Sequence, residues 1–187
     1  MNQATVFIDG GYLRKVLERY GRPRIDHERF ADWACEPYAR FRAYYYDCLP
    51  FQSSPPTPDE RRRLSEHQRF LRALQRRPRF MVRLGRLARR DRGDRVDYVQ
   101  KGIDLQMGLD IADIANLRPV EAIILVSGDA DLPPAVHYAK QRGLLVCLVH
   151  GPNGTYHQEL WDEADERKEI TATVLISVKQ ERATPAE

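Results

Sequence analysis

The sequence contains only three cysteines, Cys35, Cys48 and Cys147, and no apolar run that approaches the length of a membrane span. An odd number of cysteines without metal-ligand spacing argues against a disulfide framework and a zinc knuckle, and it indicates a reducing compartment. The opening residues MNQATVFIDGG lack the basic region and long apolar run of a secretion signal. Since a bilayer span needs about 20 apolar residues, we expect a soluble, cytoplasmic protein without membrane contact.

Net charge is also small, at +3, but the average conceals a strongly basic segment. Between residues 61 and 95 there are fourteen arginines and three acids. Clustered arginines suit phosphate backbones, and the alternative is a helix with a solvated basic face. The sequence favours nucleic-acid contact here. The arginines that we expect to contact nucleic acid are Arg61, Arg62, Arg69, Arg72, Arg76, Arg83 and Arg86.

Strand and helix patterns alternate along the chain. Apolar runs at 4–9, 120–127 and 144–151 are typical of strands buried in a parallel sheet, and helical spacing follows each of them. We also predict a helix over 97–117 and an edge strand within 169–180. The pattern predicts an α/β fold with a mostly parallel central sheet flanked by helices. We expect one domain over 1–178, with an Arg-rich helix–strand insertion at about 57–95, and a flexible tail at 179–187.

Aspartates stand where the predicted strands end. Asp9 closes the strand at 4–9, and Asp129 and Asp131 follow the strand at 120–127 in the stretch ILVSGDAD. Parallel sheets carry their sites at the carboxyl ends of strands, so Asp9 and Asp129 face each other if these strands are neighbours. Close carboxylates repel unless a cation or proton lies among them. Oxygen ligands with few histidines nearby favour Mg²⁺ or Mn²⁺ over zinc.

Each acid also has a structural interpretation. Asp9 and Asp131 precede helices, so either can be an N-cap. Asp104 lies three residues after Lys101 on a predicted helix, where the two can form an ion pair. Asp110 is six residues further on, about 240° round that helix from Asp104, so the two acids need not serve one site.

The sequence does not decide whether two groups of ring-bearing residues have a functional or a packing role. Tyr44, Tyr45 and Tyr46 can stack on nucleic-acid bases, but core packing is the commoner use of such a run. His150 and His157 flank the loop HGPNGTYH and can touch a phosphate, although a loop histidine is more often simply solvated.

The stretches VFIDGGYL, QKGIDLQMGLDIADIA and ILVSGDADLPPAVHYAKQRGLLVCLVHG, followed by LWDEADE, resemble the NYN domain of the PIN-like ribonuclease superfamily in order and spacing. The resemblance extends from residue 5 to about 170. It implies a Rossmann-like sheet with a metal-dependent nuclease site, onto which Asp9, Asp104, Asp129 and Asp131 map. Asp110 also matches a recurrent family position.

One position departs from the family pattern. Many NYN domains have asparagine where this chain has Tyr12, and tyrosine coordinates hard cations poorly but can stack on a base. The resemblance implies hydrolysis of RNA phosphodiester bonds, with Mg²⁺ or Mn²⁺ held by Asp9, Asp104 and Asp129. Lys101 can then contact the scissile phosphate, and the equal alternative is an ion pair with Asp97 or Asp104.

Two alternatives to a ribonuclease stay open. The first is a PIN-like module of weak or no activity that binds RNA or a protein partner. The second is a phosphatase-like enzyme, but its first strand would need a second acid, which FIDGGYL lacks. A homodimer formed through RFMVRLGRL, residues 79–87, is an arrangement that the sequence allows.

Overall fold

The computed structural model describes residues 2–92, 95–117 and 119–180, and of residues 88–92 and 95–100 it describes the backbone alone. Residues 181–187, most of the predicted tail, lie outside the described residues. Before them, Lys179 forms an isolated β-bridge with Ile25. The N–H of Gln180 donates to the carbonyl of Arg24.

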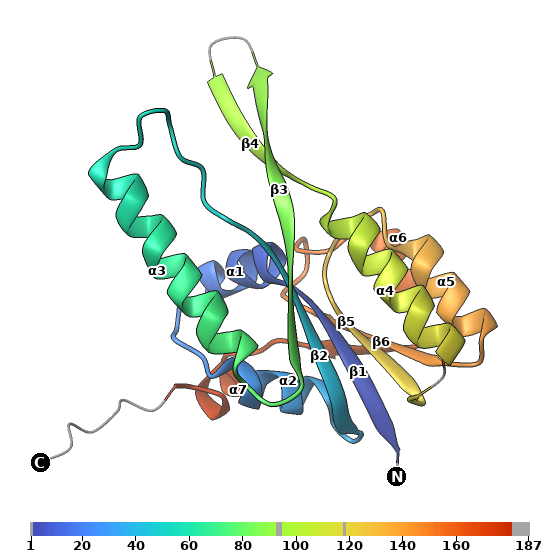
Figure 1. Ribbon diagram of the computed structural model, residues 1–187. Helices are drawn as coiled ribbons and strands as arrows, with labels where there is room; N and C mark the ends of the chain where they lie inside the picture. The colour runs from blue at the N-terminus through green and yellow to red at the C-terminus, as the bar shows by residue number, and fades with distance from the viewer. Residues whose placement is uncertain (1, 93–94, 118, 181–187) are drawn as a thin grey trace, which may run out of the picture.

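The chain forms a sheet in the order β4-β3-β2-β1-β5-β6-β7 (Figure 1). Six of the strands, from β3 to β7 across the sheet, are parallel to their neighbours, and β4 runs antiparallel to β3. This confirms the predicted α/β class with a mostly parallel sheet. The strands are β1 (Gln3–Asp9), β2 (Ala39–Cys48), β3 (Phe80–Arg92), β4 (Arg95–Lys101), β5 (Ala122–Val126), β6 (Leu145–His150) and β7 (Glu166–Glu169).

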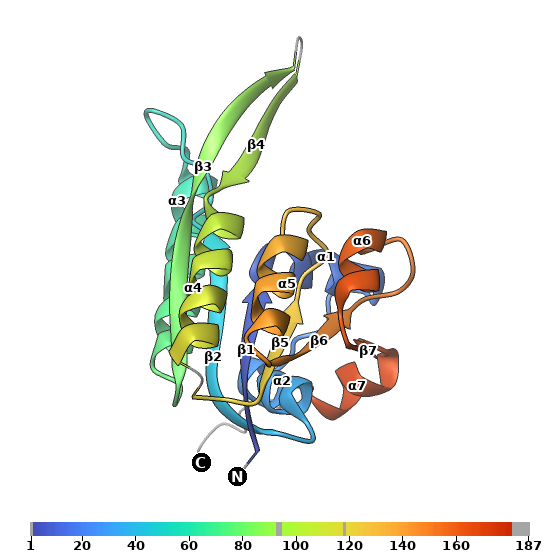
Figure 2. The ribbon, with the colours of Figure 1, turned by 90° about the vertical axis from the view of Figure 1, so that its right-hand side faces the viewer.

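Helices cover both faces of the sheet. The described helices are α1 (Gly10–Arg19), α2 (His27–Cys35), α3 (Pro58–Gln75), α4 (Ile103–Leu117), α5 (Pro133–Gln141), α6 (Gln158–Glu163) and α7 (Ala172–Ser177). Buried side chains of α1, α2, α3 and α7 form one core, and those of α4, α5 and α6 form a second core on the other face. Figure 2 looks onto the face that α4, α5 and α6 cover and shows the β3–β4 hairpin, which extends beyond these helices. Within the described residues, no helix has the length and apolar character that crossing a bilayer requires.

Local signals explain why the central elements form where they do. Every residue of β5 is buried, which suits a strand covered on both faces. The helix α3 begins with a capping box, in which Thr57 accepts from the N–H of Glu60 and the Glu60 side chain accepts from the N–H of Thr57, and Pro58 follows at the first helical position.

The predicted helix over 97–117 was wrong in its first part. Residues 95–101 pair with β3 as a strand, and the helix begins only at Ile103. Between them Gly102 has φ = 82°, a left-handed conformation that breaks a helix but suits glycine. The apolar residues before Gly102 therefore belong to a hairpin, which their helical spacing did not reveal.

The predicted edge strand within 169–180 was also wrong. The edge strand β7 ends at Glu169, and residues 172–177 form the helix α7. Thr171 caps this helix, since its side chain accepts from the N–H of Val174. A capping threonine thus outweighed the β-branched composition of the segment.

Candidate functional site

A cleft of about 720 Å³ lies at the carboxyl ends of β1 and β5. These two strands are parallel neighbours, so their ends meet at one edge of the sheet as predicted. The outer face of α1, the start of α4, the turn after β5 and the loop after β6 line the cleft. Asp9, Asp104 and Asp129 all line it, so the structure brings these three predicted acids together.

Asp9 is both a helix cap and part of the cleft. Its Oδ1 accepts from the N–H of Tyr12 at 3.0 Å, which confirms the N-cap interpretation. Burial raises the pKa of Asp9 above its ordinary value and Asp129 raises it further, while the amides of Tyr12 and Gly11 act in the opposite direction. The two interpretations of Asp9 are therefore compatible, because capping engages one carboxylate oxygen.

Asp129 is oriented by a tight turn after β5. Its N–H donates to Ser127 Oγ at 3.2 Å, and its Oδ1 accepts from the N–H of Asp131 at 2.9 Å. A Cβ at Gly128 would stand 2.5 Å from the carbonyl oxygen of Thr155, so only glycine fits there. The Ser-Gly-Asp sequence thus positions one carboxylate toward the cleft.

Asp131 lies in the turn between β5 and α5 and is not the N-cap of α5. Its side chain is exposed and does not line the cleft. The N-cap of α5 is Leu132, without a side-chain cap, so the capping interpretation was wrong. What Asp131 contributes is the backbone N–H that holds Asp129.

Asp104 lies in the first turn of α4, across the cleft from α1. Burial, together with the charges of Asp129 and Asp9, raises its pKa to about 6. Among the described residues, no three His, Cys, Asp or Glu side chains converge closely enough to form a metal-binding group as they stand. The donor set nevertheless fits Mg²⁺ or Mn²⁺ chemically, because its acids carry hard oxygens and the charges of Asp129 and Asp9 raise the pKa of Asp104.

We expect Asp104→Asn to stabilise the metal-free protein at pH 7. A folded-state pKa of about 6, against an ordinary 3.8, means that wild-type stability falls as the pH rises from about 4 to about 6. Above about pH 6 the full loss of stability from the ionised Asp104 is present, and the asparagine variant does not have this loss. Because Asp104 is partly exposed, we expect a gain of about 1 kcal/mol after discounting for solvent screening. Urea unfolding at pH 4 and pH 7 in EDTA measures it.

The matched control is Asp113→Asn, which removes the same charge from an exposed position on α4. It should leave the pH dependence of unfolding as in wild type. The prediction is wrong if the stability difference between Asp104→Asn and wild type is the same at pH 7 as at pH 4. That result would contradict the placement of Asp104 among the other acids.

Tyr12 occupies the position where the family pattern has asparagine, and it is 7% exposed. Its hydroxyl accepts from the N–H of Gly151 at 2.9 Å and lies 3.2 Å from Thr155 Oγ1. The side chain therefore ties α1 to the loop after β6 and lets Thr155 line the cleft. Tyr12 also lines the cleft, but at 7% exposure its ring offers little surface on which a base can stack.

Most of the other rings in question also lie in the interior. Tyr44, Tyr45 and Tyr46 are buried, which supports core packing over base stacking. His150 is buried, with Nδ1 2.7 Å from the carbonyl oxygen of Gly151, whereas His157 is exposed at the start of α6.

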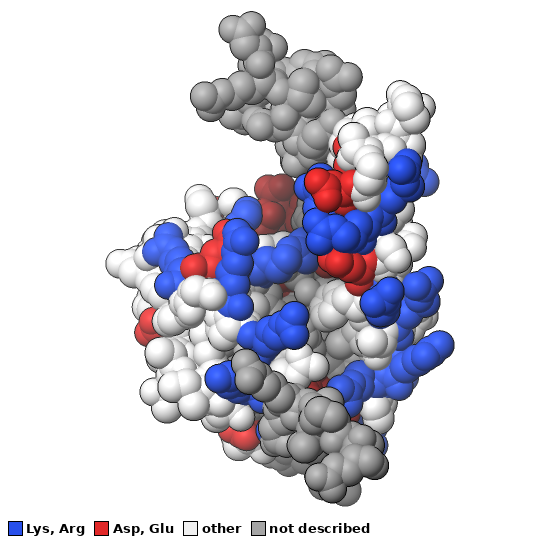
Figure 3. Space-filling model, turned by 90° about the vertical axis from the view of Figure 1, so that its left-hand side faces the viewer, with Lys and Arg blue, Asp and Glu red and all other residues white. Residues whose placement is uncertain are grey.

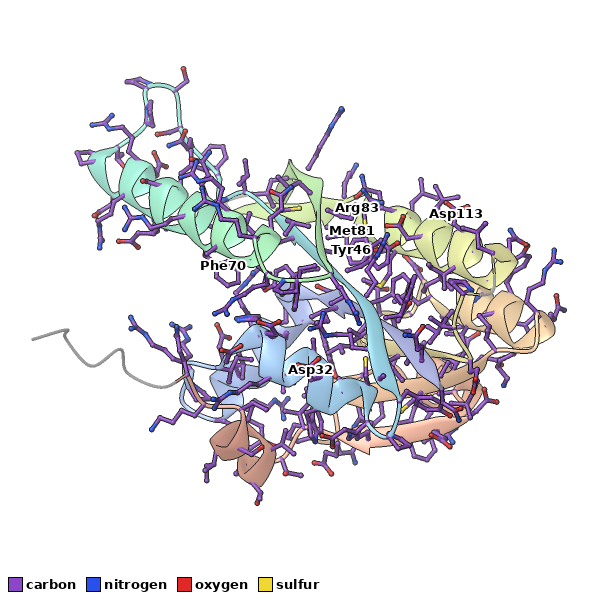
Figure 4. All side chains as sticks on the ribbon, turned by 60° about the horizontal axis from the view of Figure 1, so that its bottom comes forward. Asp32, Tyr46, Phe70, Met81, Arg83 and Asp113 are labelled. Atoms are coloured by element: carbon purple, nitrogen blue, oxygen red, sulfur yellow. The ribbon has the colours of Figure 1, made fainter. Side chains whose placement is uncertain are left out.

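Asp110 and Arg83 bind each other away from the cleft. The guanidinium of Arg83 donates to both Asp110 oxygens, at 3.1 and 3.2 Å, and the buried hydroxyl of Tyr46 donates to Oδ2 at 2.7 Å. Figure 4 shows Tyr46 and Arg83 side by side, next to α4. This network joins α4 to β2 and β3, which gives Asp110 a structural role. Lys101 is exposed at the end of β4.

The remaining predicted arginines lie on the surface. On α3 they fall within about 100° of one another round the helix, on the side opposite the buried Leu71 and Leu74. Figure 3 shows Lys and Arg gathered over this side of the molecule, around fewer acids. Arg62 pairs with Asp59 and Glu66, and Arg61 donates to the carbonyl of Pro56. The exposed arginines of the prediction are Arg61, Arg62, Arg69, Arg72, Arg76 and Arg86.

Sequence reasoning missed the charged residues that α1 contributes to the cleft, which include Arg14, and the buried partner of Arg14. Asp47, at the end of β2, is fully buried and binds the guanidinium of Arg14 on α1. His67 Nε2 lies 3.2 Å from Asp47 Oδ2, without the geometry of a hydrogen bond. The sequence did contain a signal for Asp47, because this acid directly follows the aromatic run YYY near the end of a predicted strand. The other candidate acids were identified by the same position at a strand end.

Comparisons with known proteins agree with this architecture. The family model of the NYN domain matches residues 3–171. A crystal structure of a protein of unknown function, VPA0982 from Vibrio parahaemolyticus, superposes with a TM-score of 0.61 at 25% identity, covering 91% of this chain and 94% of that one. Its fold belongs to the same class.

A curated relative shares part of the sequence. The uncharacterized protein y4oD of Sinorhizobium fredii is 33% identical over 85 residues, which are 43% of this chain and 40% of that protein. The match thus spans about two fifths of the length of y4oD. The family match, in contrast, covers nearly the whole chain, so the chain belongs to the NYN domain family, whose domains are PIN-like and of the nuclease type.

Proposed function

We propose that this protein is a ribonuclease that hydrolyses RNA phosphodiester bonds in a divalent-metal-dependent reaction. The observation that carries the proposal is the meeting of Asp9, Asp104 and Asp129 in one cleft of a nuclease-type domain. The three acids come from the end of β1, the start of α4 and the turn after β5. These elements are far apart in the sequence, and a common metal site explains why each of them contributes a carboxylate to the same cleft.

Each part of the chain has a distinct task in this reaction. Asp9, Asp104 and Asp129 would hold Mg²⁺ or Mn²⁺, which supplies a water of lowered pKa and neutralises charge on the phosphodiester. The cap on α1 and the turn after β5 keep Asp9 and Asp129 oriented. The exposed arginines of α3 and Arg86 would add affinity for the RNA backbone that does not depend on base sequence.

The test is cleavage of labelled RNA, both single-stranded and structured, by purified protein with Mn²⁺, Mg²⁺ or EDTA. We expect cleavage with either metal and none in EDTA, where RNA stays bound with an affinity that falls as salt rises. RNA that is bound but never cut under any metal would instead indicate an RNA-binding module. Absence of both binding and cleavage would remove RNA as the substrate.

A further inference from the structure

Arg14 is the cation most firmly fixed in the cleft. Its Nη1 and Nη2 donate to the two oxygens of Asp47 at 2.6 and 2.9 Å. The Asp47 side chain is fully buried, whereas that of Arg14 is 45% exposed and lines the cleft together with Asp9. One end of the ion pair is therefore anchored in the protein and the other end is open to a ligand.

The anchor itself is rigid. Asp47 Oδ1 also accepts from the N–H of Cys48 at 2.7 Å, and His67 on α3 lies against Oδ2. A guanidinium has five N–H donors in a fixed plane, of which this pairing engages two. Holding Arg14 in one orientation removes much of the entropy cost that a flexible arginine would bear on binding an anion.

The surrounding charges explain what Arg14 can bind. Three carboxylates of the cleft repel any anion that approaches them, so a phosphate chain needs a fixed positive group close by. Lys15 and Arg19 line the same cleft from α1 and extend the positive charge outward, and the one acid between them, Glu18, pairs with Arg22 at 2.9 Å. A single phosphate would satisfy Arg14 alone, but the row along α1 suits successive phosphates of a strand.

We propose that Arg14, held by Asp47, binds a backbone phosphate of RNA adjacent to the carboxylate cluster and so sets the register of the strand in the cleft. This inference rests on the proposed function. Unlike the arginines of α3, Arg14 is oriented by a buried partner, so it positions the strand as well as attracting it.

The test compares RNA affinity of wild type, Arg14→Gln and Arg14→Lys in EDTA over a range of salt. Arg14→Gln should bind about tenfold more weakly, since charge-assisted hydrogen bonds are lost. The slope of log affinity against log salt should shrink by about 0.7, the value for one phosphate contact of a single strand. Arg14→Lys should restore the slope but only part of the affinity, because lysine lacks the fork.

Two measurements guard against a folding defect. The control Arg142→Gln removes an exposed arginine at the end of α5, where it lies over the Tyr138 ring, and it should leave affinity and slope unchanged. In ¹⁵N-arginine spectra of the wild-type protein, the Arg14 Nε–H signal, assigned by its loss in Arg14→Lys, should shift when the same RNA is added in EDTA.

The outcomes separate this inference from the proposed function. Wild type that cleaves RNA, with affinity and slope unchanged in Arg14→Gln, overturns the inference alone. A shifted Arg14 signal with RNA that is bound but never cut overturns hydrolysis and supports the inference. If wild type neither binds nor cuts RNA, both are overturned.

Discussion

Asp129→Asn should reduce metal-dependent RNA cleavage at least about 100-fold, the upper range for losses at groups that merely support a metal ligand. Asparagine keeps the size of the side chain, and its oxygen can still accept from the N–H of Asp131, so the turn after β5 should persist. What disappears is a negative charge beside Asp104 and Asp9. The measurement is the single-turnover rate with Mn²⁺, with RNA affinity in EDTA followed in parallel.

The affinity should change in the opposite direction to the rate. Removing a carboxylate lowers the repulsion of the RNA backbone, so the variant should bind RNA at least as tightly as wild type in EDTA. The same substitution at Asp131, two residues away and exposed, should leave the rate within about twofold. A comparable loss in both variants would place Asp131 in the site, and full activity of Asp129→Asn would exclude Asp129 from it.

The candidate site could be predicted from the sequence because the carboxyl ends of neighbouring parallel strands lie at the same edge of a sheet. Continuous apolar runs identified β1 and β5, and their carboxyl ends had to share an edge once the strands were neighbours. Asp104 needed the family resemblance, since nothing in its local spacing links α4 to that edge. Its position still depended on the helix starting at Ile103, which the sequence pattern misplaced.

Partnerships between distant residues were not predictable in the same way. Arg83 and Asp110 are 27 positions apart, and their pairing depends on α4 packing across β3. Tyr12 reaches Gly151 across 139 positions. Such contacts depend on how the helices and strands pack once they have formed. The positions of strand ends depend only on the order of the elements along the chain, which the local sequence pattern predicts.

Asp47→Ala should lower the free energy of unfolding by about 2 kcal/mol, because it removes both hydrogen bonds to the half-exposed Arg14 and the acceptor of the Cys48 N–H. Burial alone would raise the pKa of Asp47, but His67 and Arg14 together hold it below its ordinary value. A depressed pKa means that the stabilisation is present at neutral pH and is lost as the pH falls below roughly 4. Urea unfolding of both proteins at pH 7 and pH 3 measures the difference, which should shrink at the lower pH.

Asp32→Ala provides a control matched in distance, since Asp32 Oδ1 lies 2.6 Å from Arg40 Nε just as Asp47 Oδ2 lies 2.6 Å from Arg14 Nη1. The Asp32 side chain is 56% exposed, and the buried Arg40 keeps Glu28 at 3.5 Å and the carbonyl of Pro78 as partners, so the loss of Asp32 should cost less than about 1 kcal/mol. The double variant Arg14→Met/Asp47→Ala should recover part of the loss, because no charge is then left unpaired. Similar losses in the two single variants would mean that contact distance, not burial, governs these ion pairs. A large difference would show that the burial of Asp47 strengthens its ion pair, and the same buried pair would hold Arg14 in place for a phosphate.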